Sequence, residues 1–386
     1  MKNIQLLNKI AKIGTDKLDP AVYNIGAEVE APEGIMVRSA NMLDMDFNPE
    51  LLAIARAGAG VNNIPLDKCT REGIVVFNTP GANANGVKEL AVCALLLASR
   101  DIVDGIQWVG TLKDDADAAK TVEKNKSKFA GSEIQGKTLG VIGLGAIGGL
   151  VANIAVRLGM KVVGCDPFLS VDAAWNLNHN ITHATTYEEV YKVADYITIH
   201  VPATADTKGM INASTLAMMK DGVKIINLSR DSLVKSSDMI EALANGKVSR
   251  YVTDFATQEL IGVKGAILIP HLGASTEESE DNCAVMAAVQ MDDYLTNGNI
   301  KNSVNFPAVA MPRSGDARIC VLHENVPGIL TQLTGAMSDA GLNIENMTNK
   351  SRGNAAYTIF DVTGSVPAEL ADSLDAIAAV LRVRVI

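Results

Sequence analysis

Gly143-Leu144-Gly145-Ala146-Ile147-Gly148 has the spacing of a nucleotide-binding glycine turn, and its surroundings support that interpretation. The strand-like run Thr138–Ile142 precedes it, and the helix-like run Leu150–Leu158 follows. A second apolar run, Met160–Cys165, ends at Asp166, eighteen residues after Gly148. Strand, glycine turn, helix, strand and acidic residue in this order are typical of a dinucleotide-binding βαβ unit.

Each residue type in the turn has a physical reason. Gly143 permits a tight turn, Gly145 lets a pyrophosphate approach the backbone, and Gly148 lets the helix pack on the strand. Ala146 and Ile147 open the helix, where unpaired N–H groups and the positive dipole end attract phosphate. Asp166 would accept hydrogen bonds from a ribose 2′-OH and repel a 2′-phosphate, which predicts NAD rather than NADP. The alternative is a glycine turn that serves packing alone.

Length and composition limit the possibilities. A chain of 386 residues predicts two or three domains, and 48% hydrophobic residues are enough for buried cores. The net charge of −10 argues against a nucleic-acid partner and requires local cations for any anionic substrate.

The cysteines and the apolar runs indicate in which cellular compartment the protein acts. Five scattered cysteines without a C-x-x-C pair predict neither a disulfide framework nor a metal site. The N-terminus lacks the pattern of a signal peptide, and the longest apolar run, Leu90–Ala98, is too short to span a bilayer. We therefore expect a protein of the reducing cytoplasm without a membrane partner.

Strand-like and helix-like runs alternate along most of the chain, which predicts an α/β fold with parallel sheets. Val87–Arg100 reads as a buried helix, and residues 111–137 as an exposed loop with some helix. Four later strand-like runs end in polar residues, and ligands of open α/β sheets bind outside the carboxyl ends of strands. We therefore expect one crevice to gather Pro202, Arg230, Asp254 and His271.

The C-terminal part has a different pattern. Residues 309–316 read as a linker, and residues 317–386 follow the order βαββαβ of a ferredoxin-like sheet.

Three polar residues near the expected crevice suit acid–base chemistry on an anionic substrate. His271 would shuttle a proton near neutral pH, and Glu259 could pair with its ring. Arg230 could hold a carboxylate through its two-pronged guanidinium. Singly, each has an ordinary structural explanation; together, downstream of a nucleotide turn, they favour catalysis.

With these residues the chain resembles the D-isomer-specific 2-hydroxyacid dehydrogenases, in particular the branch that acts on 3-phosphoglycerate. The resemblance also rests on Ala55–Ile64, Asn78-Thr79-Pro80, Phe129–Thr138 and His200-Val201-Pro202. It implies a Rossmann-type NAD domain (94–283), a discontinuous flavodoxin-like substrate domain (1–93 plus 284–312) and a ferredoxin-like regulatory domain (316–386).

The resemblance also implies residue roles. Hydride passes between C2 of the substrate and NAD, while His271 exchanges the hydroxyl proton, Glu259 supports it and Arg230 binds the carboxylate. Asp254 would contact the nicotinamide amide. The cofactor would further be lined by Pro202, Leu228, Ser229, Gly273 and Ala274. The substrate would be bound by Arg38, Ser39, Arg56, Gly58, Lys126 and Lys128.

The tail resembles an ACT domain, the amino-acid-binding module. His323, Asn325 and Asn343 would then contact L-serine as an effector; the alternative is a tail that only dimerises. A homodimer or homotetramer is expected.

Three functions remain open. The first is NAD-dependent oxidation of 3-phospho-D-glycerate to 3-phosphohydroxypyruvate, the first step of L-serine biosynthesis. The second is oxidation of another D-2-hydroxy acid, such as 2-hydroxyglutarate. The third is a non-catalytic NAD-sensing regulator, which the presence of Arg230, Glu259 and His271 disfavours.

Overall fold

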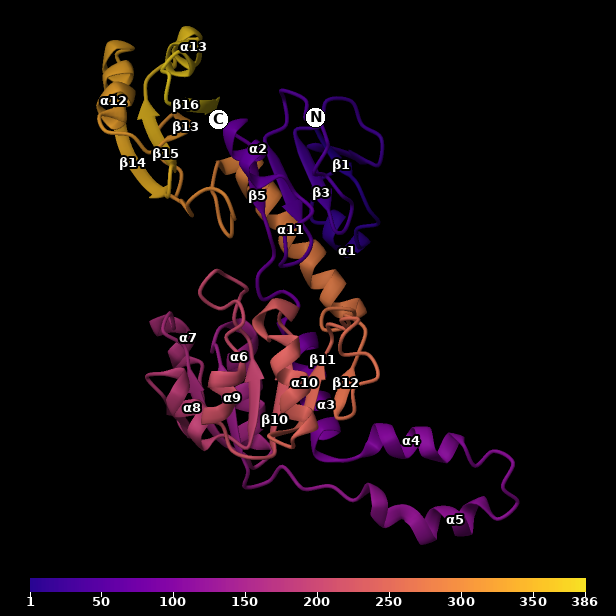
Figure 1. Cartoon of the computed structure of the whole chain (residues 1–386). Helices are drawn as coiled ribbons and strands as arrows, with labels where there is room; N and C mark the ends of the chain where they lie inside the picture. The colour runs from indigo at the N-terminus through magenta and orange to yellow at the C-terminus, as the bar shows by residue number, and fades with distance from the viewer. The chain divides into compact units, whose positions relative to one another are not determined.

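A computed structural model describes residues 1–386, which fold into two compact units (Figure 1). Unit 1 combines residues 1–83 with 280–386, and unit 2 comprises residues 84–279. The expected boundaries at residues 93 and 284 fall inside helices α3 (Ala84–Ser99) and α11 (Glu277–Asn297). The division into three domains stays a prediction. No helix has the length and apolar character needed to cross a membrane.

Unit 2 is built on a seven-stranded parallel sheet with the order β12-β11-β10-β9-β6-β7-β8. Its strands are β6 (Thr138–Ile142), β7 (Lys161–Cys165), β8 (Ile181–His183), β9 (Tyr196–Ile199), β10 (Val223–Asn227), β11 (Val248–Thr253) and β12 (Ala266–Leu268). The chain order reverses between β6 and β9, as in doubly wound nucleotide-binding folds. The predicted Rossmann-type fold is confirmed.

Helices cover both faces of this sheet. The apolar sides of α3 and α6 (Ala146–Arg157) pack on one face, and those of α8 (Tyr187–Val193), α9 (Ala213–Met218) and α10 (Ser236–Ala244) pack on the other. Successive strand residues point to opposite faces, so Ile225 joins one core and Ile226 the other. Both faces are buried, which explains why these strands read as continuous apolar runs. Two short segments, α7 (Val171–Trp175) and the 3₁₀ helix η2 (Asp231–Leu233), complete the unit.

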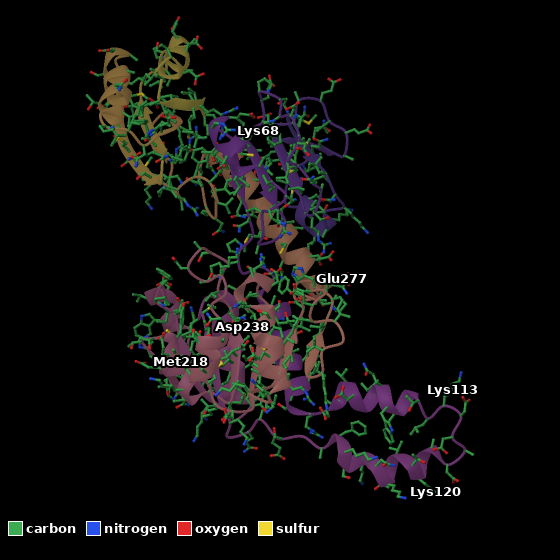
Figure 2. The ribbon with its side chains drawn as sticks, in the orientation of Figure 1. Lys68, Lys113, Lys120, Met218, Asp238 and Glu277 are labelled. Carbon is green, nitrogen blue, oxygen red and sulfur yellow. The ribbon has the colours of Figure 1, made fainter.

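An arm projects from unit 2 between α3 and β6 (Figure 1). It consists of α4 (Ile102–Gly110), α5 (Ala118–Asn125) and the 3₁₀ helix η1 (Lys126–Phe129). Figure 2 shows Lys113 and Lys120 near its far end. The rings of Trp108 and Phe129 lie 5.2 Å apart and join its two sides. Residues 111–137, predicted as an exposed loop with some helix, contain α5 and η1, while α4 precedes that segment.

Unit 1 contains a five-stranded parallel sheet with the order β2-β1-β3-β4-β5, the flavodoxin-like order. Its strands are β1 (Lys2–Leu6), β2 (Tyr23–Gly26), β3 (Gly34–Val37), β4 (Ala53–Arg56) and β5 (Val75–Phe77); the short helices are α1 (Lys12–Thr15) and α2 (Leu66–Arg71). Helix α11 packs on one face, where Ala287, Met291 and Tyr294 are buried. Strand β1 was not expected from the sequence, because its residues alternate polar and apolar weakly.

The C-terminal sheet has the antiparallel order β14-β15-β13-β16, so the predicted ferredoxin-like topology is confirmed. Its strands are β13 (Ala317–Glu324), β14 (Asn343–Arg352), β15 (Ala355–Thr363) and β16 (Val380–Val385). Helices α12 (Ile329–Asp339) and α13 (Glu369–Asp375) supply the core on one face.

The other face of this sheet packs on the core of unit 1. Cys320, Leu322 and Tyr357 belong to the same buried cluster as the residues of α11. Arg318 and Asp361 form a fully buried ion pair with an Nε–Oδ1 distance of 2.6 Å. The remaining N–H groups of the Arg318 guanidinium reach the carbonyl oxygens of residues 297, 311 and 312. The expected linker is thus hydrogen-bonded to the sheet that follows it.

Candidate cofactor and substrate sites

The glycine turn follows β6 directly and has the predicted local geometry. Gly143 adopts a φ of +88°, and a Cβ there would lie 2.6 Å from the carbonyl oxygen of His200. A Cβ on Gly148 would lie 1.9 Å from the carbonyl oxygen of Gly143, so helix and turn pack without room for a side chain. Gly145 precedes the first residue of α6, and a Cβ there would have no other atom within 4 Å. The open side of the turn can therefore accept a phosphate group at the helix N-terminus.

Asp166 lies beside this turn because β7 is the neighbour of β6. Its Oδ2 accepts a hydrogen bond from the backbone N–H of Leu144 at 2.8 Å, and its Oδ1 accepts one from that of Phe168 at 2.9 Å. Each carboxylate oxygen has a second lone pair, so Asp166 can still accept ribose hydroxyls. An acid held here suits NAD and disfavours a 2′-phosphate.

The glycine turn after β6 lies beside the segment that follows β9, because β6 and β9 are neighbours at the point where the strand order reverses. His200 directly follows β9 and is hydrogen-bonded through Nε2 to Oγ1 of Thr198 at 2.8 Å. Burial lowers the pKa of His200 to about 4, and its Nδ1 is buried without a hydrogen-bond partner. Pro202 follows it and is exposed at the same edge. The strand-end pattern predicted Pro202 but gave His200 no role, although both belong to one motif.

Asp254 offers an unused acceptor on the other side of the reversal point. It follows β11, is 2% exposed, and accepts a hydrogen bond from Gly273 N–H through Oδ2 at 3.1 Å. Its Oδ1 is buried and has no partner. Burial raises the pKa of Asp254, while the Gly273 N–H and the charges of His271 and Arg230 act in the opposite direction. The orphaned oxygen suits the N–H of a carboxamide such as that of nicotinamide.

The loop after β10 places Leu228, Ser229 and Arg230. Leu228 is buried in the α3–α6 core, and Ser229 donates from its hydroxyl to the carbonyl of residue 199 at 2.7 Å. Asn227, which no sequence motif singled out, is fully buried and holds the loop by donating to the Arg230 carbonyl at 2.8 Å. Arg230 itself is exposed and makes no ion pair with the adjacent Asp231. Its guanidinium therefore remains accessible to an anion.

His271 lies two residues before Gly273, and its exposed ring packs on Phe255 with centroids 4.7 Å apart. Glu259 is exposed in a turn anchored by the buried Leu260. No hydrogen bond or ion pair joins Glu259 to His271 in this structure, so their pairing stays a prediction. The partly buried Ala274 follows in the same loop. Arg230, Asp254 and His271 follow the neighbouring strands β10, β11 and β12, and the role of Glu259 stays a prediction.

The predicted substrate residues of unit 1 gather at the carboxyl ends of β3 and β4. Oδ1 of Asn8 accepts the backbone N–H groups of Arg38, Ser39 and residue 40 at 2.9–3.0 Å. Nε of Arg56 donates to the Arg38 carbonyl at 3.1 Å. Gly58 has a φ of +146°, and a Cβ there would lie 1.6 Å from Nη1 of Arg56, so the guanidinium lies against the glycine. The Arg56 side chain is thus held against the backbone of Arg38.

Lys126 and Lys128 lie on η1, in the arm. The arm joins unit 2 where β6 begins, because Ser132 N–H donates to the carbonyl of Ser99 at 3.0 Å. The glycine turn lies at the other end of β6, so within unit 2 these lysines are not brought to the nucleotide edge. Lys126 forms an ion pair with Glu123. Their contact with substrate stays a prediction.

The three predicted effector residues of the C-terminal sheet differ in accessibility. His323 is 1% exposed, and its ring nitrogens are hydrogen-bonded to the Glu324 carbonyl and to Oγ1 of Thr358. Asn325 and Asn343 are exposed, and their side-chain amides donate to the Gly353 carbonyl and to the Glu345 carboxylate. Of the three, only the two asparagines present accessible polar atoms to a ligand.

Comparison with known proteins agrees with this geometry. Residues 92–273 match the family profile described as D-isomer specific 2-hydroxyacid dehydrogenase, NAD binding domain. The NAD-bound 3-phosphoglycerate dehydrogenase of Entamoeba histolytica is 27% identical, with a TM-score of 0.62, covering 79% of this chain and 98% of that one. The apo D-mandelate dehydrogenase of Rhodotorula graminis shares the fold, with a TM-score of 0.68 at 23% identity, over 81% of this chain and 99% of that one. The predicted NAD-binding domain is confirmed.

Two curated relatives extend the match. D-3-phosphoglycerate dehydrogenase of Rattus norvegicus is 35% identical over 292 residues, 73% of this chain and 52% of that protein. The chain thus spans about half the length of the first relatives it matches. D-3-phosphoglycerate dehydrogenase 1 of Saccharomyces cerevisiae is 31% identical over 337 residues, 81% of this chain and 68% of that protein. By these matches the chain belongs to the D-isomer-specific 2-hydroxyacid dehydrogenase family.

Proposed function

We propose that the protein oxidises 3-phospho-D-glycerate to 3-phosphohydroxypyruvate with NAD, the reaction that opens L-serine biosynthesis. The observation that carries the proposal is that Arg230, Asp254 and His271 follow β10, β11 and β12, three neighbouring strands of the nucleotide-binding sheet. The pair of arginines at Arg38 and Arg56 supports a substrate with more than one anionic group. The names of the curated relatives agree with this substrate.

Each residue has a defined task in this proposal. NAD, when bound, supplies the hydride acceptor. The glycine turn and Asp166 bind its pyrophosphate and ribose, and Oδ1 of Asp254 orients its carboxamide. Arg230 holds the substrate carboxylate, and a ring nitrogen of His271 removes the proton from the C2 hydroxyl.

The assay is NADH formation with 3-phosphoglycerate, D-2-hydroxyglutarate and D-lactate as separate substrates. His271→Ala should lower kcat by about 100-fold or more, the scale of positioned acid–base catalysis. His179→Ala, an exposed histidine of the same unit, is the matched control and should leave kcat unchanged. If only 2-hydroxyglutarate is oxidised, it replaces 3-phosphoglycerate as the proposed substrate. If none of the three is oxidised, the result favours a non-catalytic regulator.

We also propose that L-serine binds at the C-terminal sheet through Asn325 and Asn343, with His323 supporting the strand from within. Side-chain amides can hydrogen-bond both the carboxylate and the ammonium group of an amino acid. Calorimetric titration with L-serine should detect binding that Asn343→Ala weakens. If no serine binding is detected, the C-terminal sheet has a structural role only.

We further propose that the protein is a homodimer that uses its arm. Helices α4 and α5 contain no buried residue, and Ile106 is 68% exposed beside the exposed Ile102 and Val109. These side chains border a cavity of about 420 Å³. Ile106→Asp should produce monomers in light scattering coupled to size exclusion, whereas a monomeric wild type would exclude the arm as an interface.

We propose a reducing compartment, the cytoplasm, as the place of action. All five cysteines are free thiols, and Cys93 is exposed. Exposed thiols persist where glutathione and thioredoxin keep them reduced.

A further inference from the structure

Glu280 forms an ion pair at the site where the substrate anion is expected. It lies near the start of α11, whose first residue Glu277 is labelled in Figure 2. Its Oε1 lies 2.6 Å from Nη2 of Arg38. Neither the glycine-turn pattern nor the acid–base candidates single out this glutamate.

The arrangement around Arg38 is rigid at the backbone and open at the side chain. Asn8 fixes the backbone of Arg38, and Arg56 donates to its carbonyl. The side chains of Arg38 and Glu280 are 41% and 42% exposed. A ligand can therefore reach their pair from solvent.

A second arginine–carboxylate pair in the same unit shows the contrast. Arg318 and Asp361 are 0% exposed, and the Arg318 guanidinium also contacts three backbone carbonyls. Breaking such a pair leaves a buried charge without a partner, so it is suited to structure. An exposed pair contributes little free energy, so an anion with more charge can displace its carboxylate.

Glu280 lowers the positive charge that this corner of the sheet offers to an anion. Glu280 pairs with the Arg38 guanidinium, and Arg56 donates to the Arg38 carbonyl, so the three residues lie at one corner of the sheet. Two guanidinium groups suit a dianionic phosphate, and the Glu280 carboxylate opposes that attraction. The chain as a whole carries a net charge of −10, so the protein as a whole supplies no surplus of cations.

We propose that Glu280 is an internal competitor of the substrate: its carboxylate occupies the Arg38 guanidinium until an anionic group of the substrate displaces it. Glu280 is thus a positioning and specificity residue that acts through Arg38. It sets substrate affinity, and its effect grows with the charge of the incoming anion. This inference rests on the proposed function, because it assigns Arg38 to the substrate of that reaction.

The test is the kinetics of Glu280→Gln with 3-phospho-D-glycerate and with D-glycerate, which lacks only the phosphate. We expect KM for 3-phosphoglycerate to fall about fivefold and KM for D-glycerate to fall about twofold or less, with kcat unchanged. Glu277→Gln removes a charge from the same helix turn at a residue that forms no ion pair, and should match wild type. In an Arg38→Met background, Glu280→Gln should have no effect on KM.

An unchanged or higher KM for 3-phosphoglycerate in Glu280→Gln would overturn the proposal, as would an equal fall for both substrates. Failure of the proposed function would be recognised separately, because the wild type itself would then oxidise no 3-phosphoglycerate. In that case calorimetric titration with inorganic phosphate tests Glu280 without turnover. Glu280→Gln should bind phosphate about fivefold more tightly than wild type, and equal affinity would refute the competition.

Discussion

The lowered pKa of His200 predicts that the folded protein loses stability in acid. The ring of His200 is buried beneath the glycine turn, which lowers its pKa from 6.5 to about 4. The unfolded chain therefore binds a proton between these two pH values that the folded protein does not bind. Stability from this group is present above pH 6.5 and is lost as the pH falls toward 4.

The size of the effect follows from the two pKa values. Each pKa unit corresponds to about 1.4 kcal/mol, so the loss should reach about 2 kcal/mol at pH 5 and about 3 kcal/mol at pH 4. His200→Gln keeps an amide near Thr198 and does not titrate, so it should lack this loss.

Two measurements check the argument. Urea unfolding of wild type and His200→Gln should give free energies that diverge by about 2 kcal/mol between pH 7 and pH 5, with the wild type losing more. Proton NMR should follow the ring of His200 among only five histidines and find it uncharged at pH 5. Parallel stability curves, or an NMR titration near pH 6.5, would refute the burial argument.

Three further predictions concern binding and stability. Gly148→Ala should weaken NAD binding about tenfold or more, because its Cβ would lie 1.9 Å from the carbonyl oxygen of Gly143; calorimetry with NAD would show it, and normal affinity would contradict the packing role. Asp254→Asn should raise KM for NAD about tenfold without changing KM for the 2-hydroxy acid, since the amide oxygen would take the Gly273 N–H and an NH2 donor would replace the free Oδ1 acceptor; a change in KM for the 2-hydroxy acid alone would argue against the assigned role of Asp254. Arg318→Met should cost about 3–5 kcal/mol in denaturant unfolding by leaving Asp361 buried and unpaired, and Arg318→Met with Asp361→Leu should recover part of it; a loss of less than about 1 kcal/mol in the single variant would show that water reaches the Asp361 carboxylate.

The nucleotide-binding half could be predicted because its signals are local. The spacing of Gly143, Gly145 and Gly148 is set by the turn they form and by the helix that follows it. Asp166 comes one strand later, at a spacing that the βαβ unit dictates. Alternation of strand and helix then restricts the strand order to a few topologies.

The candidate catalytic residues were placed from strand ends, and their roles stay predictions. Arg230, Asp254 and His271 do follow the neighbouring strands β10, β11 and β12. The pairing of Glu259 with His271 stays a prediction: Glu259 lies in a turn anchored by the buried Leu260, and no hydrogen bond or ion pair joins the two side chains. Loop conformation depends on what each loop packs against, which a short stretch of sequence does not encode.

The sequence by itself determined the fold class, the NAD-type turn and the family resemblance, because each depends on residues within one or two neighbouring elements. Only the tertiary structure decided that Oδ1 of Asp254 lacks a partner and that Glu280 occupies Arg38, across 242 residues of chain. Hydrogen bonds and ion pairs between distant residues depend on where whole elements pack. That packing follows from the burial of many apolar side chains together, and no local pattern records it.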